Sequence, residues 1–397
     1  MNELSSVNNT LSNIYADYIE GLTPRRRHEL AHCKRFIECW YGDADFRQLL
    51  AKSPANKELI ALAYGIEIDI GQLRTIWHQD YQHLQDSYAE SETAPLAYQW
   101  HRHLQHLKSH RTLRQSRLQE QLQSHLFGFW REVQISRCND ELQTSPYQIT
   151  HPCFAFELSD GCSVGCWFCG VSAASFKGYY AYDEQNSRLW RSILLFLSER
   201  FGAVALQTGF CYWASDPSDN PDYLKFTRDY YQIANFLPQT TTARPIKNIA
   251  WTKELIAMSQ QSLSVPNRFS ILSLKTLQAV HQYFSAEDLF TIELVMQHKQ
   301  AIGFKKLLSG RILEKRTQLE VASRGDLNKL NISEDYGSIA CVSGFVINMP
   351  QKRIELVSPC KPSVENPKGY IVFARSYFKN FTDFCSKIDG FQEYMRT

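Results

Sequence analysis

Short apolar stretches alternate with longer amphipathic ones from about residue 150 onward. In HPCFAFEL the apolar residues Phe154, Phe156 and Leu158 fall on one face, which is typical of a strand. A helical pattern then runs from Asp183 to about Phe201. Strands that alternate with helices of about ten to fifteen residues predict βαβ units, a parallel sheet and right-handed crossovers.

The same rhythm repeats to about residue 320. We expect AVALQTGF to form the second strand, PQTTTARP to begin the third unit, RFSILSL to begin the fourth, and LFTIELVMQ to form the fifth strand. This count predicts a (β/α) barrel, complete or partial. The chemistry of such a barrel lies at the C-terminal ends of its strands.

The segments before and after the predicted barrel follow other patterns. In residues 1–135 apolar side chains recur at helical spacing, and Asp43 or Asp45 is the expected cap of one helix. In residues 321–397 two alternating runs flank the turn Met349-Pro350-Gln351-Lys352 and predict an antiparallel hairpin, to which GYIVFARSYF adds a strand. The chain is therefore predicted to be α/β, with an N-terminal all-helical domain, a barrel over residues 150–320 and a C-terminal β-hairpin cap.

The composition argues against two classes of partner. The chain has 397 residues and a net charge of +2 at pH 7, so no strong field draws it to nucleic acid or to a membrane surface. No apolar run approaches the roughly 18 residues of a membrane span, and the first ten residues lack the pattern of a secretory signal. Eleven cysteines, an odd number, fit a reducing compartment. We expect a cytoplasmic protein that binds neither nucleic acid nor membranes.

Three of the cysteines are clustered in a loop directly after the first predicted strand. Cys162, Cys166 and Cys169 have the spacing Cys-x3-Cys-x2-Cys, with no fourth cysteine nearby. Structural zinc usually takes four ligands in paired groups, whereas three thiolates can hold a [4Fe–4S] cluster and leave one iron open. The alternatives are a zinc loop with a distant fourth ligand and a chance occurrence of this spacing. We expect a catalytic [4Fe–4S] cluster.

This loop resembles the signature of the radical S-adenosylmethionine superfamily, in which the same spacing follows the first strand of a partial (β/α)6-type barrel. The resemblance implies that the methionine end of S-adenosylmethionine binds the open iron. It also implies that one electron from an external reductant, of flavodoxin or ferredoxin type, releases a 5′-deoxyadenosyl radical.

Contacts to S-adenosylmethionine are expected at the ends of the later strands. Where the superfamily usually has Gly-Gly-Glu, this chain has Gly209–Pro217, so a side chain or backbone carbonyl groups of this segment must accept from the amino group. The candidate residues are Tyr212, Trp213, Ser215 and Asp216, then Thr241, Thr242 and Arg244, and more weakly Ser270 and Ser273. The alternative for a polar residue at a strand end is a helix cap.

A closer resemblance covers about residues 150–375. The segments GCWFCGVSAASFKGYYAYDEQNSRLWR, GFCYWASDPSDNPDY, PQTTTARP, RFSILSLKTL and ACVSGFVINM…LVSPC together look like the radical peptide epimerases of ribosomal peptide maturation, of the proteusin type. The resemblance implies that L-residues of a precursor peptide become D-residues. The radical removes the Cα hydrogen, and a thiol returns hydrogen from the opposite face.

Three isolated cysteines are candidates for that thiol. Cys360 ranks first because it follows the predicted strand Arg353–Val357 in a loop. Cys341 in the hairpin ranks second and Cys211 third. A buried structural role is the alternative for each.

The precursor peptide carries a leader, for which the enzyme needs a surface. Residues 36–50 and 58–68 faintly resemble such leaders, so the helical domain either docks the leader or only buttresses the barrel. Other functions stay open: a methyltransferase or lyase with one cluster, a DNA-lesion lyase, and a non-catalytic redox sensor. The net charge of +2 argues against the DNA enzyme.

Overall fold

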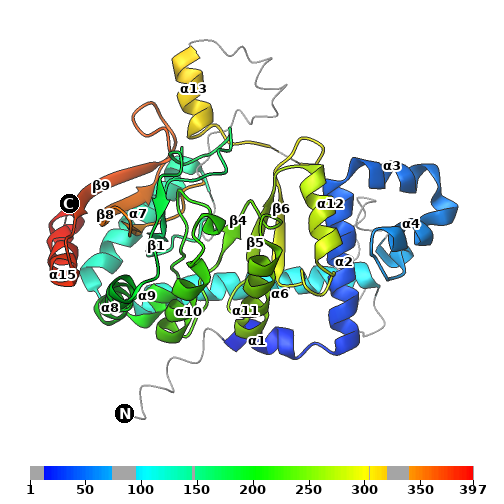
Figure 1. The fold of residues 1–397 in the computed structure, drawn as a ribbon, viewed down its shortest axis with the longest axis horizontal. Helices are drawn as coiled ribbons and strands as arrows, with labels where there is room; N and C mark the ends of the chain where they lie inside the picture. The colour runs from blue at the N-terminus through cyan, green and yellow to red at the C-terminus, as the bar shows by residue number, and fades with distance from the viewer. Residues whose placement is uncertain (1–12, 74–94, 145–147, 304, 320–338, 397) are drawn as a thin grey trace. The chain divides into compact units, whose positions relative to one another are not determined.

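The computed structural model describes residues 13–73, 95–144, 148–303, 305–319 and 339–396 (Figure 1). The expectation for the first ten residues lies outside them. The fold is mixed α/β. Among the described residues, none of the helices combines the length and the apolar character needed to cross a membrane.

The chain divides into two compact units. Unit 1 comprises residues 1–113 and 245–304, and unit 2 comprises residues 114–244 and 305–397. The three domains expected from the sequence, with boundaries near 135, 150 and 320, stay a prediction.

Unit 1 contains mainly helices and one pair of strands. The helices are α1 (Asn13–Glu20), α2 (Pro24–Gly42), α3 (Ala44–Lys52), η1 (Pro54–Asn56), α4 (Lys57–Ala63), η2 (Ile70–Leu73), the start of α6 (Leu96–Gln121), α11 (Ile249–Ser262) and α12 (Leu274–Tyr283). The strands β5 (Asn267–Ile271) and β6 (Ile292–Met296) pair in parallel. The expected fourth strand, its helix and the fifth strand are therefore confirmed.

The N-terminal helices form because local capping and apolar burial agree. The Asp43 carboxylate accepts the N–H groups of Asp45 and Phe46, at 2.8 and 3.0 Å, and so caps α3. Phe46 is fully buried and meets Phe36 of α2 edge-on. Asp43, one of the two caps expected from the sequence, is thus confirmed.

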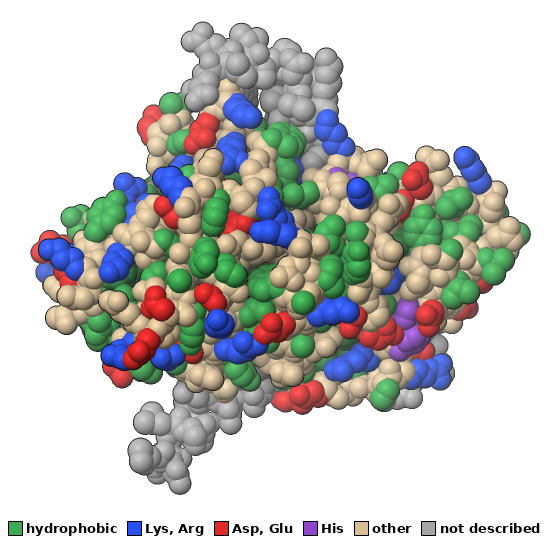
Figure 2. Space-filling view, viewed as in Figure 1, with side chains coloured by type: hydrophobic (Ala, Val, Ile, Leu, Met, Phe, Trp, Pro, Cys, Tyr) green, Lys and Arg blue, Asp and Glu red, His purple; other side chains and the backbone are tan. Residues whose placement is uncertain are grey.

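An apolar surface lies on α3 and α4. Leu49, Leu59 and Leu62 are 44%, 69% and 59% exposed, and Figure 2 shows apolar side chains gathered over these two helices. Exposed apolar side chains that gather in one place are typical of a contact surface.

Unit 2 holds the predicted barrel start and the C-terminal strands. Its elements are the end of α6, α7 (His125–Leu142), β1 (Phe154–Glu157), β2 (Ser159–Asp160), β3 (Gly178–Tyr179), α8 (Glu184–Phe201), α9 (Ala203–Gln207), η4 (Pro217–Asp219), α10 (Tyr223–Ala234), β4 (Thr241–Thr242), α13 (Arg311–Leu319), β7 (Gly344–Asn348), β8 (Arg353–Pro359), β9 (Tyr370–Tyr377), α15 (Phe381–Gly390) and η5 (Phe391–Met395).

A four-stranded sheet in the order β1-β7-β8-β9 joins distant parts of the sequence. β7 and β8 form the expected antiparallel hairpin, and β9 pairs antiparallel with β8, as expected. β7 also pairs in parallel with β1, with Phe154 opposite Phe345. Figure 1 shows these orange and red strands running beside β1.

The other edge of β1 continues the parallel arrangement. Parallel bridges join Ala155 to Phe210 and Phe210 to Gln239. Phe156 points to the helices, where it contacts Trp190 of α8 and Tyr230 of α10. The segments of β1, Phe210 and Gln239 therefore lie side by side, while the described strands of this unit do not close into a barrel.

The prediction of a strand over AVALQTGF is wrong for most of its length. Residues Ala203–Gln207 form the short helix α9, and only Phe210 bridges to the neighbouring strand. A short apolar run does not distinguish a strand from a buried helix by periodicity. Here Ala205 and Leu206 are buried in the helical conformation.

Candidate functional site

The three clustered cysteines lie in a loop between β2 and β3, directly after β1. The Cys162 amide donates to the Ala174 carbonyl oxygen (2.9 Å), so the loop closes on itself. Gly161 has φ +79°, and a side chain there would overlap the Ser175 carbonyl group. The loop therefore needs glycine at its entrance.

Arg311, at the start of α13, holds one side of this loop. Its Nη1 donates to the Cys166 carbonyl oxygen (2.6 Å), its Nη2 donates to the Ala173 carbonyl oxygen, and its amide donates to the Cys169 carbonyl oxygen (3.0 Å). This residue was not predicted from the sequence. Its partners are up to 145 positions away, and no local pattern marks such a contact.

The other side of the loop is held at Ser163. The Asp219 carboxylate accepts from the Ser163 amide (2.8 Å) and from its hydroxyl group. Arg244, a predicted site residue, donates from Nη2 to the Ser163 carbonyl oxygen (2.7 Å). Arg244 thus contacts the cysteine loop, whereas Asp219 was missed by the sequence analysis.

Burial raises the pKa of two thiols of the loop, those of Cys162 and Cys166. Burial raises the pKa of Cys162 to about 11, and the charges of Asp216 and Asp219 raise it further while nearby amides lower it. Burial and the charge of Cys169 raise the pKa of Cys166. A metal group that binds here must therefore displace protons, which couples its binding to pH.

The sulfur atoms of the three clustered cysteines do not all lie within 4.8 Å of one another. A tetrahedral zinc ion, with Zn–S bonds of about 2.3 Å, would hold its sulfur ligands about 3.8 Å apart. The spread of the three thiols in the structure is therefore wider than the sulfur spacing around a bound zinc ion.

The two aromatic residues of the loop have different surroundings. Phe168 packs against Leu308, Ile312 and Leu313, and the ammonium of Lys306 lies 3.4 Å from the centre of its ring. Burial lowers the pKa of Lys306 to about 8, although the nearby Cys166 raises it. Trp167 is 38% exposed.

Asp216 ties the second parallel segment to the third. One carboxylate oxygen accepts from the Thr242 hydroxyl (2.8 Å) and the Ser218 amide (2.9 Å), and the other accepts from the Ala243 amide (2.8 Å). Both oxygens thus already have donors from this chain. The predicted pair Asp216 and Thr242 is brought together, and contact of either residue with S-adenosylmethionine stays a prediction.

Tyr212 and Trp213 lie on the face of the sheet away from α8 and α10. Thr241 donates to the Tyr212 hydroxyl (2.7 Å), which donates to the Gln239 side chain (3.2 Å). Trp213 meets the Tyr370 ring at 5.4 Å. The predicted Tyr212 and Thr241 are therefore in direct contact. Ser215, the remaining candidate in this segment, is half-buried.

The three isolated cysteines face different parts of unit 2. Cys341 is half-buried and packs, with Tyr212 and Trp213, against the apolar cluster that contains Phe210 and Val357. We call these five residues, together with Tyr370 of the same cluster, the inner cluster.

Cys360 and Cys211 face helices instead. Cys360 is 3% exposed and interacts electrostatically with Arg137, Cys138 and Glu141 of α7. Its neighbour Ser358, of the same strand parity, accepts from Arg137 (3.3 Å). Cys211 is 1% exposed, and its charge would raise the pKa of Tyr223 and Tyr230 of α10.

Ser270 and Ser273 belong to unit 1. The Ser273 hydroxyl accepts from the Thr276 amide (3.0 Å), so it caps α12, the alternative noted for polar strand ends. Ser270 lies in β5 opposite Val295. Their role toward S-adenosylmethionine stays a prediction.

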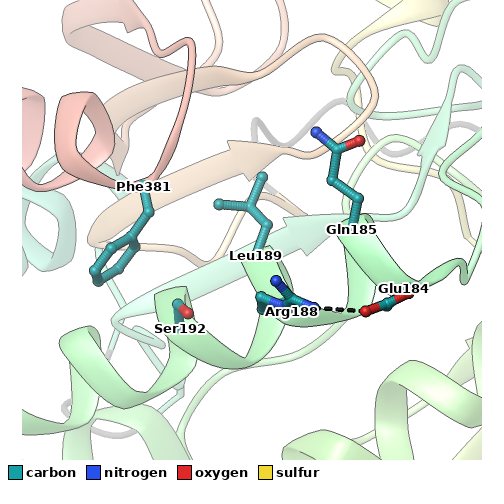
Figure 3. Close-up of a pocket in the computed structure, with 6 residues that line it drawn as sticks. All are labelled: Glu184, Gln185, Arg188, Leu189, Ser192 and Phe381. Atoms are coloured by element: carbon teal, nitrogen blue, oxygen red, sulfur yellow. Dashed lines mark hydrogen bonds and ion pairs between the residues drawn. The ribbon is translucent and has the colours of Figure 1, made fainter.

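A surface hollow of about 410 Å³ lies on the exposed side of α8 (Figure 3). Its lining residues are Glu184, Gln185, Arg188, Leu189, Ser192 and Phe381. Arg188 and Glu184 form an ion pair along the helix (2.6 Å). None of these six residues is a predicted site residue.

The described residues define a mixed α/β protein with a three-cysteine loop after its first parallel strand. The chain is 42% identical over 363 residues to a protein of Sinorhizobium fredii (strain NBRC 101917 / NGR234) described as "Uncharacterized protein y4wI". The match spans 91% of this chain and 69% of that protein, so this chain belongs to the same family. No family model matches the chain, and no solved structure matches it.

Proposed function

We propose that this protein is a radical S-adenosylmethionine peptide epimerase that converts L-residues of a precursor peptide to D-residues in the cytoplasm. The observation that carries the proposal is the inner cluster. It places one half-buried thiol, that of Cys341, against the segment of Tyr212 and Trp213 that follows the cysteine loop in the parallel order.

The residues of the loop fit a [4Fe–4S] cluster. Cys162, Cys166 and Cys169 supply three soft ligands, and the Ala173 amide donates to the Cys169 sulfur (3.3 Å), a contact that tunes such clusters. When bound, the cluster and S-adenosylmethionine supply a 5′-deoxyadenosyl radical that removes the Cα hydrogen of the peptide. We further propose that the parallel segments of β1, Phe210 and Gln239 begin a partial (β/α)6-type barrel.

We propose Cys341 as the hydrogen donor in place of Cys360, the first candidate from the sequence. Cys341 belongs to the inner cluster, whereas Cys360 lies within electrostatic range of charged groups of α7. A donor must reach the peptide radical on the face opposite to abstraction, and the Cys360 side chain, which is 3% exposed, offers little access to a bound peptide.

Cys341 donates one hydrogen atom to the peptide radical in the proposed step. The S–H bond of Cys341 breaks and a Cα–H bond forms, which leaves a D-residue and a thiyl radical on Cys341. One electron from the external reductant and one proton from solvent return this radical to the thiol. The proposed partners are therefore the precursor peptide with its leader and a flavodoxin- or ferredoxin-type reductant.

A matched pair of variants tests the assignment. Both Cys341→Ala and Cys360→Ala are reconstituted with iron and sulfide, supplied with the precursor peptide in heavy water, and assayed for 5′-deoxyadenosine and for deuterium at Cα of D-residues. We expect Cys341→Ala to release 5′-deoxyadenosine without forming D-residues. Cys360→Ala is expected to form deuterated D-residues.

Other results identify the rivals. Deuterated D-residues from Cys341→Ala would refute the donor assignment. A product of changed mass would indicate a methyltransferase or a lyase. A cluster spectrum without 5′-deoxyadenosine after reduction would leave the redox sensor as the function.

A further inference from the structure

A cluster of two histidines and two glutamates lies in unit 1. His28 and His32 are one helical turn apart on α2 and so lie on one face. Glu67 follows α4, and Glu287 follows α12. We call these four residues the histidine–glutamate cluster. The predicted cofactor site does not include them.

The polar atoms of the cluster lie close together. One ring nitrogen each of His28 and His32 and one carboxylate oxygen of Glu67 all lie within 4.8 Å of one another. The Glu287 Oε1 atom lies 2.7 Å from His28 Nδ1 and 3.1 Å from His32 Nε2. Three separate segments of the chain thus bring four metal-binding side chains to one place.

The charges of the cluster suit a cation. The side chain of His32 is only 4% exposed, and burial lowers its pKa although Glu287 opposes this effect. The pKa of Glu287 is lowered: burial raises it, but a backbone hydrogen bond and the contact with His28 outweigh burial. A neutral imidazole beside an anionic carboxylate is the ligand state that divalent metals need.

We propose that the histidine–glutamate cluster is a structural zinc site. Two imidazole nitrogens with carboxylate oxygens favour a zinc-type ion, whereas calcium and magnesium prefer oxygen ligands alone. The ion would cross-link α2, the segment after α4 and the turn after α12. The alternative is a metal-free network in which both histidines donate to Glu287.

Zinc binding has a local consequence at Glu67. In the structure the Glu67 amide donates to His32 Nδ1 (3.1 Å). In the zinc-bound state a neutral His32 ring uses Nδ1 either to bind the ion or to carry the ring proton. In both cases the Glu67 amide loses its acceptor, so its hydrogen exchange becomes faster when zinc is added.

The test uses the full chain with Cys162, Cys166 and Cys169 replaced by alanine, so that the loop thiols do not take up zinc. After dialysis against a chelator, Zn²⁺ is titrated in competition with a chromophoric chelator. We expect one zinc per chain, a higher thermal midpoint with zinc, and faster exchange of the Glu67 amide. His28→Ala should weaken zinc binding at least about 10-fold, a loss that even the outer residues of metal sites produce.

His101→Ala is the matched control, because His101 on α6 contacts Gln105 instead of the cluster. Its zinc affinity should equal that of the parent. Equal affinity in His28→Ala and the parent, or less than one zinc per chain in the parent, would overturn the proposal. If His28→Ala is unfolded, Glu287→Gln decides in its place, since it keeps the shape of the side chain and removes its charge.

Discussion

Removal of the Arg311 side chain should open the cysteine loop without unfolding the protein. The guanidinium donates to the carbonyl groups of Cys166 and Ala173. Hydrogen bonds from charged groups contribute about 1.5–3 kcal/mol each, and the lower end applies because the side chain is half-exposed. Arg311→Ala therefore costs about 3 kcal/mol, which changes the ratio of closed to open loop about 100-fold.

Hydrogen exchange measures this ratio directly. In the closed loop the amides of Cys169 and Ser172 donate to the carbonyl groups of Cys166 and Cys169. We expect both amides to exchange about 100-fold faster in Arg311→Ala, because exchange follows the open population. The free energy of unfolding in urea should fall by no more than the same ~3 kcal/mol, because the unfolded chain lacks these hydrogen bonds too, and the protein stays folded.

Two further variants make the test specific. Arg311→Lys keeps the charge but cannot reach two carbonyl groups as a fork, so its exchange should fall between the parent and the alanine variant. Arg188→Ala removes an exposed ion pair, with side chains 73% and 87% exposed, and should change nothing. Loop amides that exchange at the parental rate in Arg311→Ala would refute the clamp.

Three other perturbations have defined outcomes. Gly310 has φ +55°, and a side chain there would overlap the Cys169 carbonyl group, so Gly310→Ala should lower the free energy of unfolding by about 1–3 kcal/mol, measured by urea titration. Burial raises the pKa of Cys162 to about 11. The protonated thiol therefore stabilises the folded, cluster-free chain fully below about pH 8.5, and this stabilisation is lost as the pH rises through 11. Urea midpoints at pH 8 and 10.5 measure the loss. Leu59→Glu with Leu62→Glu should weaken precursor binding at least about 10-fold if α4 docks the leader, as measured by fluorescence anisotropy.

Each of these has a control and a contrary result. Gly178→Ala adds a side chain where no atom lies within 4 Å and should be neutral, so an equal loss at both glycines would contradict the overlap. A Cys162→Ala chain should lose less stability between pH 8 and 10.5 than the parent, and an equal loss would contradict the linkage. Leu195→Glu is the control for the α4 variant, because it changes a leucine that is 49% exposed on α8, and it should leave precursor binding unchanged. Unchanged binding in the α4 double variant would leave only the buttress role for these helices.

Helix caps and strand alternation in the sequence correctly predicted α8 and the hairpin of β7 and β8. Asp183 caps α8 through the Asn186 amide (2.7 Å), and the turn at Met349–Lys352 joins two strands whose alternation is plain in the sequence. The strand predicted over Ala203–Gln207 is wrong because so short an apolar run fits both the strand and the helix period. The segment forms a helix in which Ala205 and Leu206 are buried.

Only part of the candidate site could be predicted from the sequence. The cysteine spacing located the loop, but Arg311 and Asp219 hold it from distant segments, and no pattern near either residue announces this. Cys341 and Cys360 show a related limit. Successive residues of β8 face opposite sides: Val357 faces the inner cluster and Ser358 faces α7. Cys360 follows directly after this strand and lies on the side of Ser358. The side on which Cys360 lies follows from the sequence only after one strand residue has been assigned to a face.

The pairing of β1 with β7 sets the order of events during synthesis. Phe154 lies opposite Phe345, so the ribosome adds 190 residues after Phe154 before it reaches Phe345. At about 5–20 residues per second this takes about 10–40 s. Until then β1 lacks its neighbour on that edge, and the loop lacks Arg311 for most of the same interval. If the loop holds the proposed [4Fe–4S] cluster, a cluster delivered to the nascent chain would meet a loop without the Arg311 contacts, and assembly would then favour the finished polypeptide.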